Sequence, residues 1–377
     1  MLKFLVGLVK GGIMAVLLSQ CASADVLCLD LPAGQVGSIA ASDETLVVGY
    51  PNDALVRVFT FEHPKGPLTL VAELTLPEES TLSSIDDFRF GQSVSISGEV
   101  VVVSAVAMRR ESYPSFAEIP AGTGYYVVSG LYSFSLATGE FRPTGQVLLE
   151  SGLQHLPPNL PRRIGSALAN DGQIVVVAGE DLPVGGARDG FVIVVSNDGS
   201  DVRFLRAPSG QSAGFASDVA VAEGRIVIGD GLGPAWVTRA GVDPTLYPVG
   251  SGAAETSGGE RVALDGVTLV FSSSGISRPS GTWTADISGP VPGSIQKVSD
   301  RAGEVAVDGN RIGIVERMRG EGRSAYAGHV VDLTGAEMAT APMIQQSSHL
   351  HVAAGSGQLV FVTTDRDRSC VSMVAAD

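Results

Sequence analysis

Seven copies of one short pattern run along this chain, and this repeat limits the fold more than any other feature of the sequence. Each copy reads as a short alternating strand, a tight turn and a second strand rich in β-branched residues. Repetition at about 50 residues is typical of arrays whose neighbouring units bury each other's apolar faces. The copies span residues 37–51, 90–105, 164–179, 217–231, 259–273, 302–316 and 350–364.

The turn of each copy carries a hairpin signal. Six of the seven turns place Gly second, and Gly accepts the positive φ that a two-residue hairpin turn requires. The turns are expected at Asp43-Glu44, Ser97-Gly98, Asp171-Gly172, Glu223-Gly224, Asp265-Gly266, Asp308-Gly309 and Ser356-Gly357. The strands that follow contain few polar residues, which is typical of strands covered on both faces. They are Leu46–Val48, Val100–Val103, Ile174–Val177, Ile226–Ile228, Leu269–Phe271, Ile312–Val315 and Leu359–Val362.

A column of mostly small side chains recurs on the first strand of every copy. It consists of Ala41, Ser95, Ala169, Val221, Ala263, Ala306 and Ala354. In a β-propeller the first strands of all blades converge near the central axis, where little room remains. A sandwich or a solenoid gives no reason for such a column. The sequence therefore predicts an all-β, seven-bladed β-propeller with four strands in each blade.

The remaining strands are weaker, and the two chain ends lack partners. Third and fourth strands are expected at Leu131–Leu136 and Gly145–Leu149 in the second repeat, and at Phe191–Ser196 and Val202–Arg206 in the third. Val26–Leu31 precedes the first repeat, and the last repeat ends at Ser369–Ala375 without a fourth strand. We therefore expect the N-terminal strand to join the last blade and close the ring.

The cysteines agree with that closure. If Cys21 is removed with a signal peptide, Cys28 and Cys370 remain, and an even pair in an oxidising compartment is expected to form a disulfide. The alternative is two free, buried thiols. A bond here would tie the two ends of the chain together.

The first 24 residues read as a secretory signal. Lys3 and Lys10 supply the positive region, residues 11–19 are apolar, and Ala22-Ser23-Ala24 is a small-residue cleavage site. We expect a mature chain of residues 25–377 that forms one propeller domain, exported to the periplasm or beyond the cell. The alternative is a lipoprotein anchored at Cys21. No later apolar run is long enough to span a bilayer.

Composition excludes some functional classes. Hydrophobic residues make up 44% and charged residues 17%, which indicates a folded chain rather than a disordered one. The net charge is −15, and an acidic chain is a poor ligand for nucleic acid because phosphate neutralisation needs a basic face. The charge is typical of a soluble protein.

The blade pattern resembles the FG-GAP repeats of integrin α-chain propellers and of many bacterial exported proteins. Phe90-Gly91-Gln92-Ser93 through Ala105 is the best match, followed by the repeats that begin at Val36-Gly37 and Ile164-Gly165. The resemblance covers residues 26–377, and repeats four to seven are degenerate. It implies a propeller that binds its partner on one face. Calcium loops are common in that family, but this chain has no good copy of one, so we expect no metal and no cofactor. The alternative is a calcium site in one of the loops.

No catalytic constellation is evident, and an enzyme is the less favoured interpretation. Gly210–Gly214 matches a nucleophile elbow around Ser212, but a strand rather than a helix follows it. His349 and His351 lie on one side of a strand, either as the start of a metal site or, more simply, as ordinary polar side chains.

The resemblance places the second–third loops of the blades on the binding face. The longest is 105–124, and another is 316–327. Arginine and aromatic residues there form the candidate contact set, because both types are enriched at binding hot spots. The set is Arg109, Arg110, Tyr113, Phe116, Arg188, Arg317, Arg319, Arg323, Arg366 and Arg368.

Two functions follow from these observations. The first is a non-enzymatic binding or scaffold propeller that contacts a protein or glycan partner at the cell envelope. The alternative is a polysaccharide hydrolase or lyase with carboxylates in the central funnel.

Overall fold

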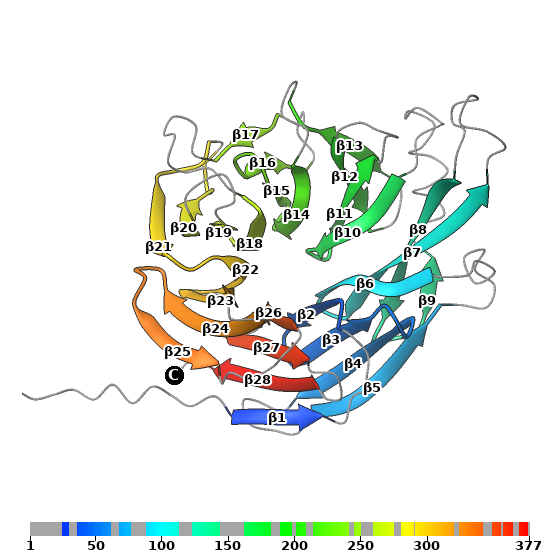
Figure 1. Cartoon of the computed structure of the whole chain (residues 1–377), viewed down its shortest axis with the longest axis horizontal. Helices are drawn as coiled ribbons and strands as arrows, with labels where there is room; N and C mark the ends of the chain where they lie inside the picture. Colours follow the sequence, from blue (N-terminus) through cyan, green and yellow to red (C-terminus); the bar gives the residue numbers. More distant parts are fainter. Residues whose placement is uncertain are drawn as a thin grey trace, which may run out of the picture.

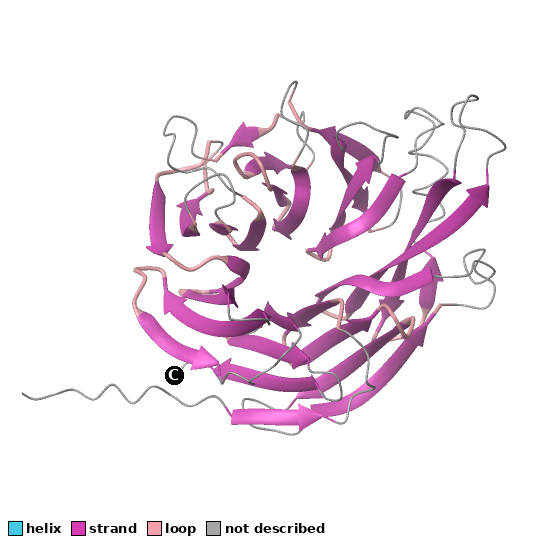
Figure 2. Ribbon diagram, viewed as in Figure 1, coloured by secondary structure: helices cyan, strands magenta, loops and turns pink. Residues whose placement is uncertain are grey.

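The computed structural model contains strands and no helix in the part of the chain that it describes (Figure 2). The described residues are 25–29, 36–61, 68–76, 88–112, 123–143, 162–181, 189–197, 201–208, 214–240, 245–249, 259–274, 280–289, 291–319, 324–341, 349–355, 357–364 and 369–375. The signal-peptide prediction for residues 1–24 lies outside them. None of the described residues form a helix that could cross a membrane.

The strands form seven antiparallel sheets of four. The first sheet holds β2 (Ser38–Ser42), β3 (Thr45–Tyr50), β4 (Leu55–Phe61) and β5 (Leu68–Thr75), and the second holds β6 (Phe88–Ser97), β7 (Val100–Ser112), β8 (Thr123–Ser135) and β9 (Phe141–Pro143). The third holds β10 (Arg162–Asn170), β11 (Ile174–Asp181), β12 (Asp189–Ser196) and β13 (Val202–Arg206). The fourth holds β14 (Phe215–Ala222), β15 (Arg225–Asp230), β16 (Trp236–Arg239) and β17 (Tyr247–Pro248).

The last three sheets follow the same order. The fifth holds β18 (Arg261–Asp265), β19 (Thr268–Ser273), β20 (Gly281–Asp286) and β21 (Ile295–Ser299), and the sixth holds β22 (Gly303–Asp308), β23 (Arg311–Arg319), β24 (Ser324–Asp332) and β25 (Glu337–Ala341). The seventh holds β26 (His349–Gly355), β27 (Gln358–Thr364), β28 (Ser369–Ala375) and, outermost, β1 (Asp25–Leu29).

The seven sheets surround a common axis (Figure 1). The first strand of each sheet contacts the first strand of the next, from β2 through β6, β10, β14, β18 and β22 to β26, and β26 contacts β2. One cluster of buried apolar side chains fills each of the seven junctions between neighbouring sheets. The predicted all-β, seven-bladed propeller is therefore confirmed.

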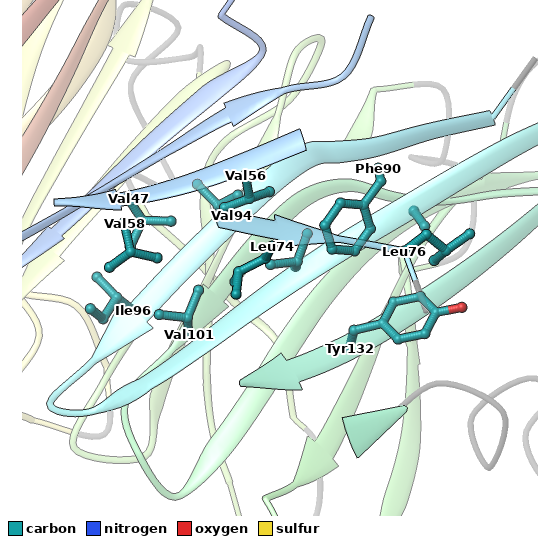
Figure 3. Close-up of a cluster of buried hydrophobic side chains, with 12 residues drawn as sticks. Val47, Val56, Val58, Leu74, Leu76, Phe90, Val94, Ile96, Val101 and Tyr132 are labelled. Carbon is teal, nitrogen blue, oxygen red and sulfur yellow. The ribbon is translucent and has the colours of Figure 1, made fainter. Parts of the chain in front are cut away.

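The junction between the first two sheets illustrates why the ring holds together (Figure 3). Val47 and Val58 of the first sheet pack against Val101 of the second, all without solvent exposure. Phe90 meets Tyr132 edge to face, with ring centroids 5.9 Å apart. Each such side chain contributes about 1.5–3 kcal/mol on full burial. A single sheet exposes these faces, so the blades depend on one another.

The seventh sheet brings the two ends of the chain together. β1 lies outside β28 (Figure 1) and pairs with it antiparallel, with Cys28 directly opposite Cys370. Cys370 is disulfide-bonded. Independently of β1, the ring is continuous through the cluster that joins the seventh sheet to the first, where Val360 and Val362 pack with Leu46 and Val48.

The pair Phe90-Gly91 marks a bulge at the start of the inner strand. The pairing register shifts between Phe90 and Val94, and Gly91 has a φ of 83°. The same shift follows Ile164 and Phe215. In the fourth sheet the second position is Ala216, which takes a φ of 63°. The repeat there begins at Phe215, two residues earlier than the predicted boundary.

The hairpin turns link neighbouring sheets. The side chain of Asp265 accepts a hydrogen bond from the backbone N–H of Gly309 at 2.7 Å, and Asp308 accepts one from Gly357 at 3.1 Å. Asp171 and Gly224 make the same connection at 2.8 Å. The Asp of these turns therefore acts on the next blade as well as on its own turn. This side of the ring is called the turn face below.

Several predicted boundaries were wrong. Three turns lie one residue later than expected, at 98–99, 266–267 and 309–310, because Ser97, Asp265 and Asp308 still pair within their strands. The fourth strand of the second sheet is Phe141–Pro143, and residues 145–149 lie outside the described residues. The strands predicted in the third repeat at 191–196 and 202–206 are present.

Candidate binding face at the mouth of the axial channel

The inner strands enclose a narrow channel along the axis. Its volume is about 240 Å³, and all seven members of the predicted small-residue column line it. Among the described residues, its wall is aliphatic apart from Ser95 and Asn170. The column is therefore placed as expected. The carboxylates that the alternative function requires are not part of the described channel wall.

Charged side chains gather where four inner strands begin. Asp218 on β14, Glu304 on β22 and His351 on β26 each directly precede a residue of the channel wall, and Arg261 on β18 lies two residues before Ala263. We call these four residues the axial cluster, and the side of the ring on which the inner strands begin the mouth face. Asp218, Glu304 and His351 are half-buried, whereas Arg261 is exposed.

His351 and Glu304 form a pair that joins three blades. The Nδ1 atom of His351 lies 3.0 Å from Oε2 of Glu304, and its Nε2 atom lies 3.3 Å from the carbonyl oxygen of Val36, which leads into the first sheet. The backbone N–H of Val352 donates to Oε1 of Glu304 at 3.2 Å. Both ring nitrogens face acceptors, so the doubly protonated imidazolium is favoured.

The Glu304 carboxylate and the His351 imidazole each favour the charged form of the other. Burial opposes the charged form of both residues. For His351 the Glu304 carboxylate outweighs burial and raises the pKa of the imidazole. For Glu304 burial is likewise outweighed, chiefly by the charge of His351, and the pKa of the carboxyl is lowered. The charged form of each side chain is therefore favoured by the other.

Asp218 connects the fourth and fifth blades. Its Oδ1 atom accepts the N–H of Val219 and its Oδ2 atom accepts the N–H of Val262, both at 3.0 Å. Burial raises the pKa of Asp218 to about 6, although Arg261 and the two N–H donors act in the opposite direction. Asp218 in turn is the main cause of the raised pKa of Arg261, to which Glu304 and Glu260 also contribute.

This arrangement suits recognition. All four carboxylate oxygens of Asp218 and Glu304 accept a hydrogen bond or ion pair, so both groups are held in fixed positions. Arg261 presents a guanidinium with several N–H donors beside them. Among the residues that the structure describes, no three His, Cys, Asp or Glu side chains come together as a metal site.

The predicted contact residues fall into two groups. Arg109 and Arg110 lie on β7, opposite Tyr126 and Tyr125 on β8, and Arg319 ends β23. Arg317 is exposed on β23 opposite Tyr326. The others lie outside the described residues: Tyr113, Phe116, Arg188, Arg323, Arg366 and Arg368, together with Ser212 of the elbow motif.

The loops predicted to carry the contact residues are shorter than expected. β7 continues to Ser112 and β8 begins at Thr123, so residues 105–112 and 123–124 of the segment predicted as a loop belong to an extended pair of strands. Figure 1 shows this hairpin reaching beyond the neighbouring blades. β23 and β24 likewise occupy most of 316–327. The strands continue because backbone pairing persists past the edge of the ring.

Sequence reasoning missed three members of the axial cluster. Each looked like an ordinary solvated charge, and His351 was considered only with His349. A usable signal exists, since all four residues stand two or three positions before the small-residue column. The first three repeats carry polar, uncharged residues three positions before that column: Ser38, Gln92 and Ser166.

No protein-family model matches the sequence, and no curated protein is similar to it in sequence. Solved structures do share its architecture. A chain of a mitotic checkpoint complex is 10% identical, with a TM-score of 0.55 over 100% of this chain and 98% of that one. A catalytically inactive virginiamycin B lyase from Staphylococcus aureus, crystallised with quinupristin, is 12% identical, with a TM-score of 0.52 over 93% and 99%.

A third structure, the Pan2 WD40 domain from Neurospora crassa, is 12% identical, with a TM-score of 0.49 over 94% of this chain and 97% of that one. The likeness is one of fold. At these identities the first two alignments support the circular arrangement of sheets and carry no information about ligands.

Proposed function

We propose that this chain is a non-enzymatic binding or scaffold propeller, exported from the cytoplasm, that holds a protein or glycan partner on its mouth face. The observation that carries the proposal is the axial cluster. Four blades place charged, solvent-accessible side chains around one end of a narrow apolar channel, and bonds between blades fix their positions. Pre-positioned polar groups lower the ordering cost of binding.

The extended β7–β8 hairpin supports the same assignment. It leaves the inner ring on the mouth-face side, because β7 runs away from the turn at 98–99. Its register sets Arg109 and Arg110 against tyrosines of the partner strand. Arg317 and Tyr326 repeat this pairing in the sixth sheet. Arginine and tyrosine are the residue types that dominate binding hot spots.

The family proposal is the FG-GAP repeat. Its support is the role of the Phe-Gly pair: Phe90 is fully buried and Gly91 forms the bulge that admits the neighbouring blade. A carbon atom added at Gly91 would lie 2.8 Å from a methyl group of Val56 and 3.0 Å from the carbonyl oxygen of Leu55. Position 91 therefore requires glycine both for its positive φ and for the absence of a side chain.

Export is proposed from the N-terminal sequence, with cleavage after Ala24. The register of Cys28 against Cys370 supports it, because a disulfide between them requires an oxidising compartment. Intact-mass spectrometry of the native protein tests both points. We expect a chain that begins near Asp25 and carries no free thiol. A chain that retains Met1, or an acylated Cys21, would contradict this proposal.

The partner is tested by affinity capture from the extracytoplasmic fraction of the producing cells, followed by titration of the purified partner. Substitution of Arg261→Ala removes the exposed cation of the axial cluster, and a second variant replaces Arg109, Arg110 and Tyr113 by Ser. We expect both to weaken binding at least tenfold, and the melting temperature of the triple variant should stay unchanged. Lys297→Ala, which removes a cation from the outer strand β21, is the matched control. Equal binding by all variants would remove the mouth face from the proposal.

A second function has one specific observation in its favour. The pKa of Asp218 is raised to about 6 by burial while that of Glu304 is lowered, which is the division of roles expected of an acid and a base in polysaccharide cleavage. Release of reducing ends or unsaturated products from purified polysaccharides tests it. Activity that disappears in Asp218→Asn and Glu304→Gln would establish this function in place of binding.

A further inference from the structure

The four residues of the axial cluster alternate in charge from one blade to the next. Asp218 on β14 is followed by Arg261 on β18, then by Glu304 on β22 and His351 on β26, and the inner strands contact one another in this order. With His351 protonated, the cluster holds two carboxylates and two cations, with no excess of either sign. The first three inner strands carry uncharged polar residues near the same level: Ser38, Gln92 and Ser166.

Arg261 is the member of the cluster that is available to a ligand. Its side chain is exposed, and in the described part of the chain no group forms a hydrogen bond or an ion pair with its guanidinium. The carboxylates of Asp218 and Glu304 are close enough to act on it, because both raise its pKa against the opposing effect of burial. A planar group with several N–H donors therefore lies near two carboxylates without being bonded to either.

The carboxylates hold fixed positions and can still accept further hydrogen bonds. Asp218 accepts the N–H groups of Val219 and Val262, each at 3.0 Å. Glu304 accepts one backbone N–H and lies 3.0 Å from a ring nitrogen of His351. Each carboxylate oxygen can accept more than one hydrogen bond, so a hydroxyl donor can be added without loss of these contacts.

A ligand with a net charge gains little at such a cluster. An anion that approaches Arg261 is repelled by Asp218 and Glu304, and Glu260 adds a further carboxylate nearby. A cation that approaches either carboxylate of the cluster is repelled by Arg261. Vicinal hydroxyl groups avoid both penalties, because a hydroxyl can donate to a carboxylate while its oxygen accepts from the guanidinium. The alternating charges therefore favour a neutral ligand that carries several hydroxyl groups.

We propose that the axial cluster binds a neutral glycan, with neighbouring hydroxyl groups of one sugar ring held by Arg261 and by the carboxylate of Asp218 or Glu304. This inference rests on the mouth-face binding function proposed above and names the class of its partner. The sugar ring lies over the end of the channel, whose wall is aliphatic directly after the charged residues.

Ligand-observed NMR with a panel of trisaccharides tests the proposal on the mature protein. The neutral members are built from glucose, galactose, mannose or N-acetylglucosamine, and the charged members from galacturonic acid or glucosamine. We expect a neutral member to bind with a Kd between about 0.1 and 10 mM, because the described channel wall offers no aromatic ring for stacking. The charged members should bind at least tenfold more weakly. The Kd of the neutral sugar should stay within about twofold between about 0.01 and 1 M salt, because no ion pair forms.

Variants assign the binding to the cluster. Arg261→Met removes the guanidinium but keeps an aliphatic stem, and it should weaken binding of the neutral sugar at least tenfold. Arg203→Gln removes an exposed arginine from the turn face and should leave binding unchanged. Circular dichroism checks that each variant retains its β-structure. The comparison of neutral and charged sugars uses the wild-type protein, so it tests the proposal even if Arg261→Met fails to fold.

Three results would overturn the inference. They are no binding of any neutral trisaccharide at about 10 mM, equal binding of the charged sugars, and full binding by a folded Arg261→Met variant. A captured protein that needs Arg261 and that no sugar displaces would assign the cluster to a peptide, and the mouth-face function would then remain. If neither the sugars nor a captured partner depend on Arg261, the mouth-face function fails as well.

Discussion

The contact between Gly49 and Gly91 offers a direct test of how neighbouring blades fit together. A Cβ atom added at Gly91 would meet Val56 at 2.8 Å, Leu55 at 3.0 Å and the Cα atom of Gly49 at 3.2 Å. Gly98 is the matched control. It also has positive φ, 53° against 83°, but a Cβ atom there has nothing within 4 Å. The two substitutions share the backbone penalty and differ in packing.

The magnitude follows from these two terms. An alanine in the left-handed region costs about 1–2 kcal/mol, offset by about 0.4–1 kcal/mol because the unfolded chain loses freedom. Gly98→Ala should therefore destabilise by about 1 kcal/mol. Gly91→Ala adds an overpacking cost of about 1–3 kcal/mol, for a total of about 2–4 kcal/mol. Gly49→Ala lacks the φ penalty, but its Cβ atom would collide with the carbonyl oxygen of Gly91.

Urea denaturation followed by circular dichroism measures these differences, with the slope of each transition compared across variants. The double variant of Gly49 and Gly91 should cost less than the sum of the single variants, because both push apart the same two strands. If Gly91→Ala falls within about 0.5 kcal/mol of Gly98→Ala, the tight approach of the first two blades is not what requires glycine, and the packing argument fails.

Three further predictions concern stability. Burial raises the pKa of Asp218 from 3.8 to about 6, so Asp218 ionises at lower pH in the unfolded chain than in the folded protein. Between pH 4 and 6 this residue should therefore lower the free energy of unfolding by about 2–3 kcal/mol after allowance for solvent screening. Asp218→Asn should flatten that part of the plot of stability against pH, and an unchanged slope would contradict the raised pKa. Cys28→Ser should lower the free energy of unfolding by about 2–5 kcal/mol under oxidising conditions. The variant and the wild type should be equally stable once dithiothreitol reduces Cys370, and a difference that persists in the reductant would mean that Cys28 acts by packing. Asp265→Ala removes the acceptor for Gly309 N–H and should cost about 0.5–1.5 kcal/mol in a thermal melt, whereas a neutral result would show that water replaces this bond.

Much of the fold could be predicted from the repeat. The small-residue column, the seven hairpins and the apolar second strands each reflect a requirement that recurs in every blade, so seven weak signals reinforce one another. The bounds of the third-repeat strands at 191–196 and 202–206 were within two residues of the structure for the same reason. The fourth strand of the second sheet was misplaced because outer strands are partly solvated and carry little pattern.

The candidate sites could not be predicted from the repeat. Asp218, Arg261, Glu304 and His351 are spread over more than 130 residues of sequence, and each alone resembles a surface charge. The bulge at Ala216 was missed because alanine seldom takes positive φ.

Local requirements, such as turn chemistry, β-branched strands and small residues near a crowded axis, are carried by residues close together in the chain, and they were sufficient to indicate seven sheets in a ring. The electrostatic sites arise where different blades meet. Their pKa values and hydrogen bonds depend on distances between residues that no local pattern relates, because closure of the ring is what brings those residues together.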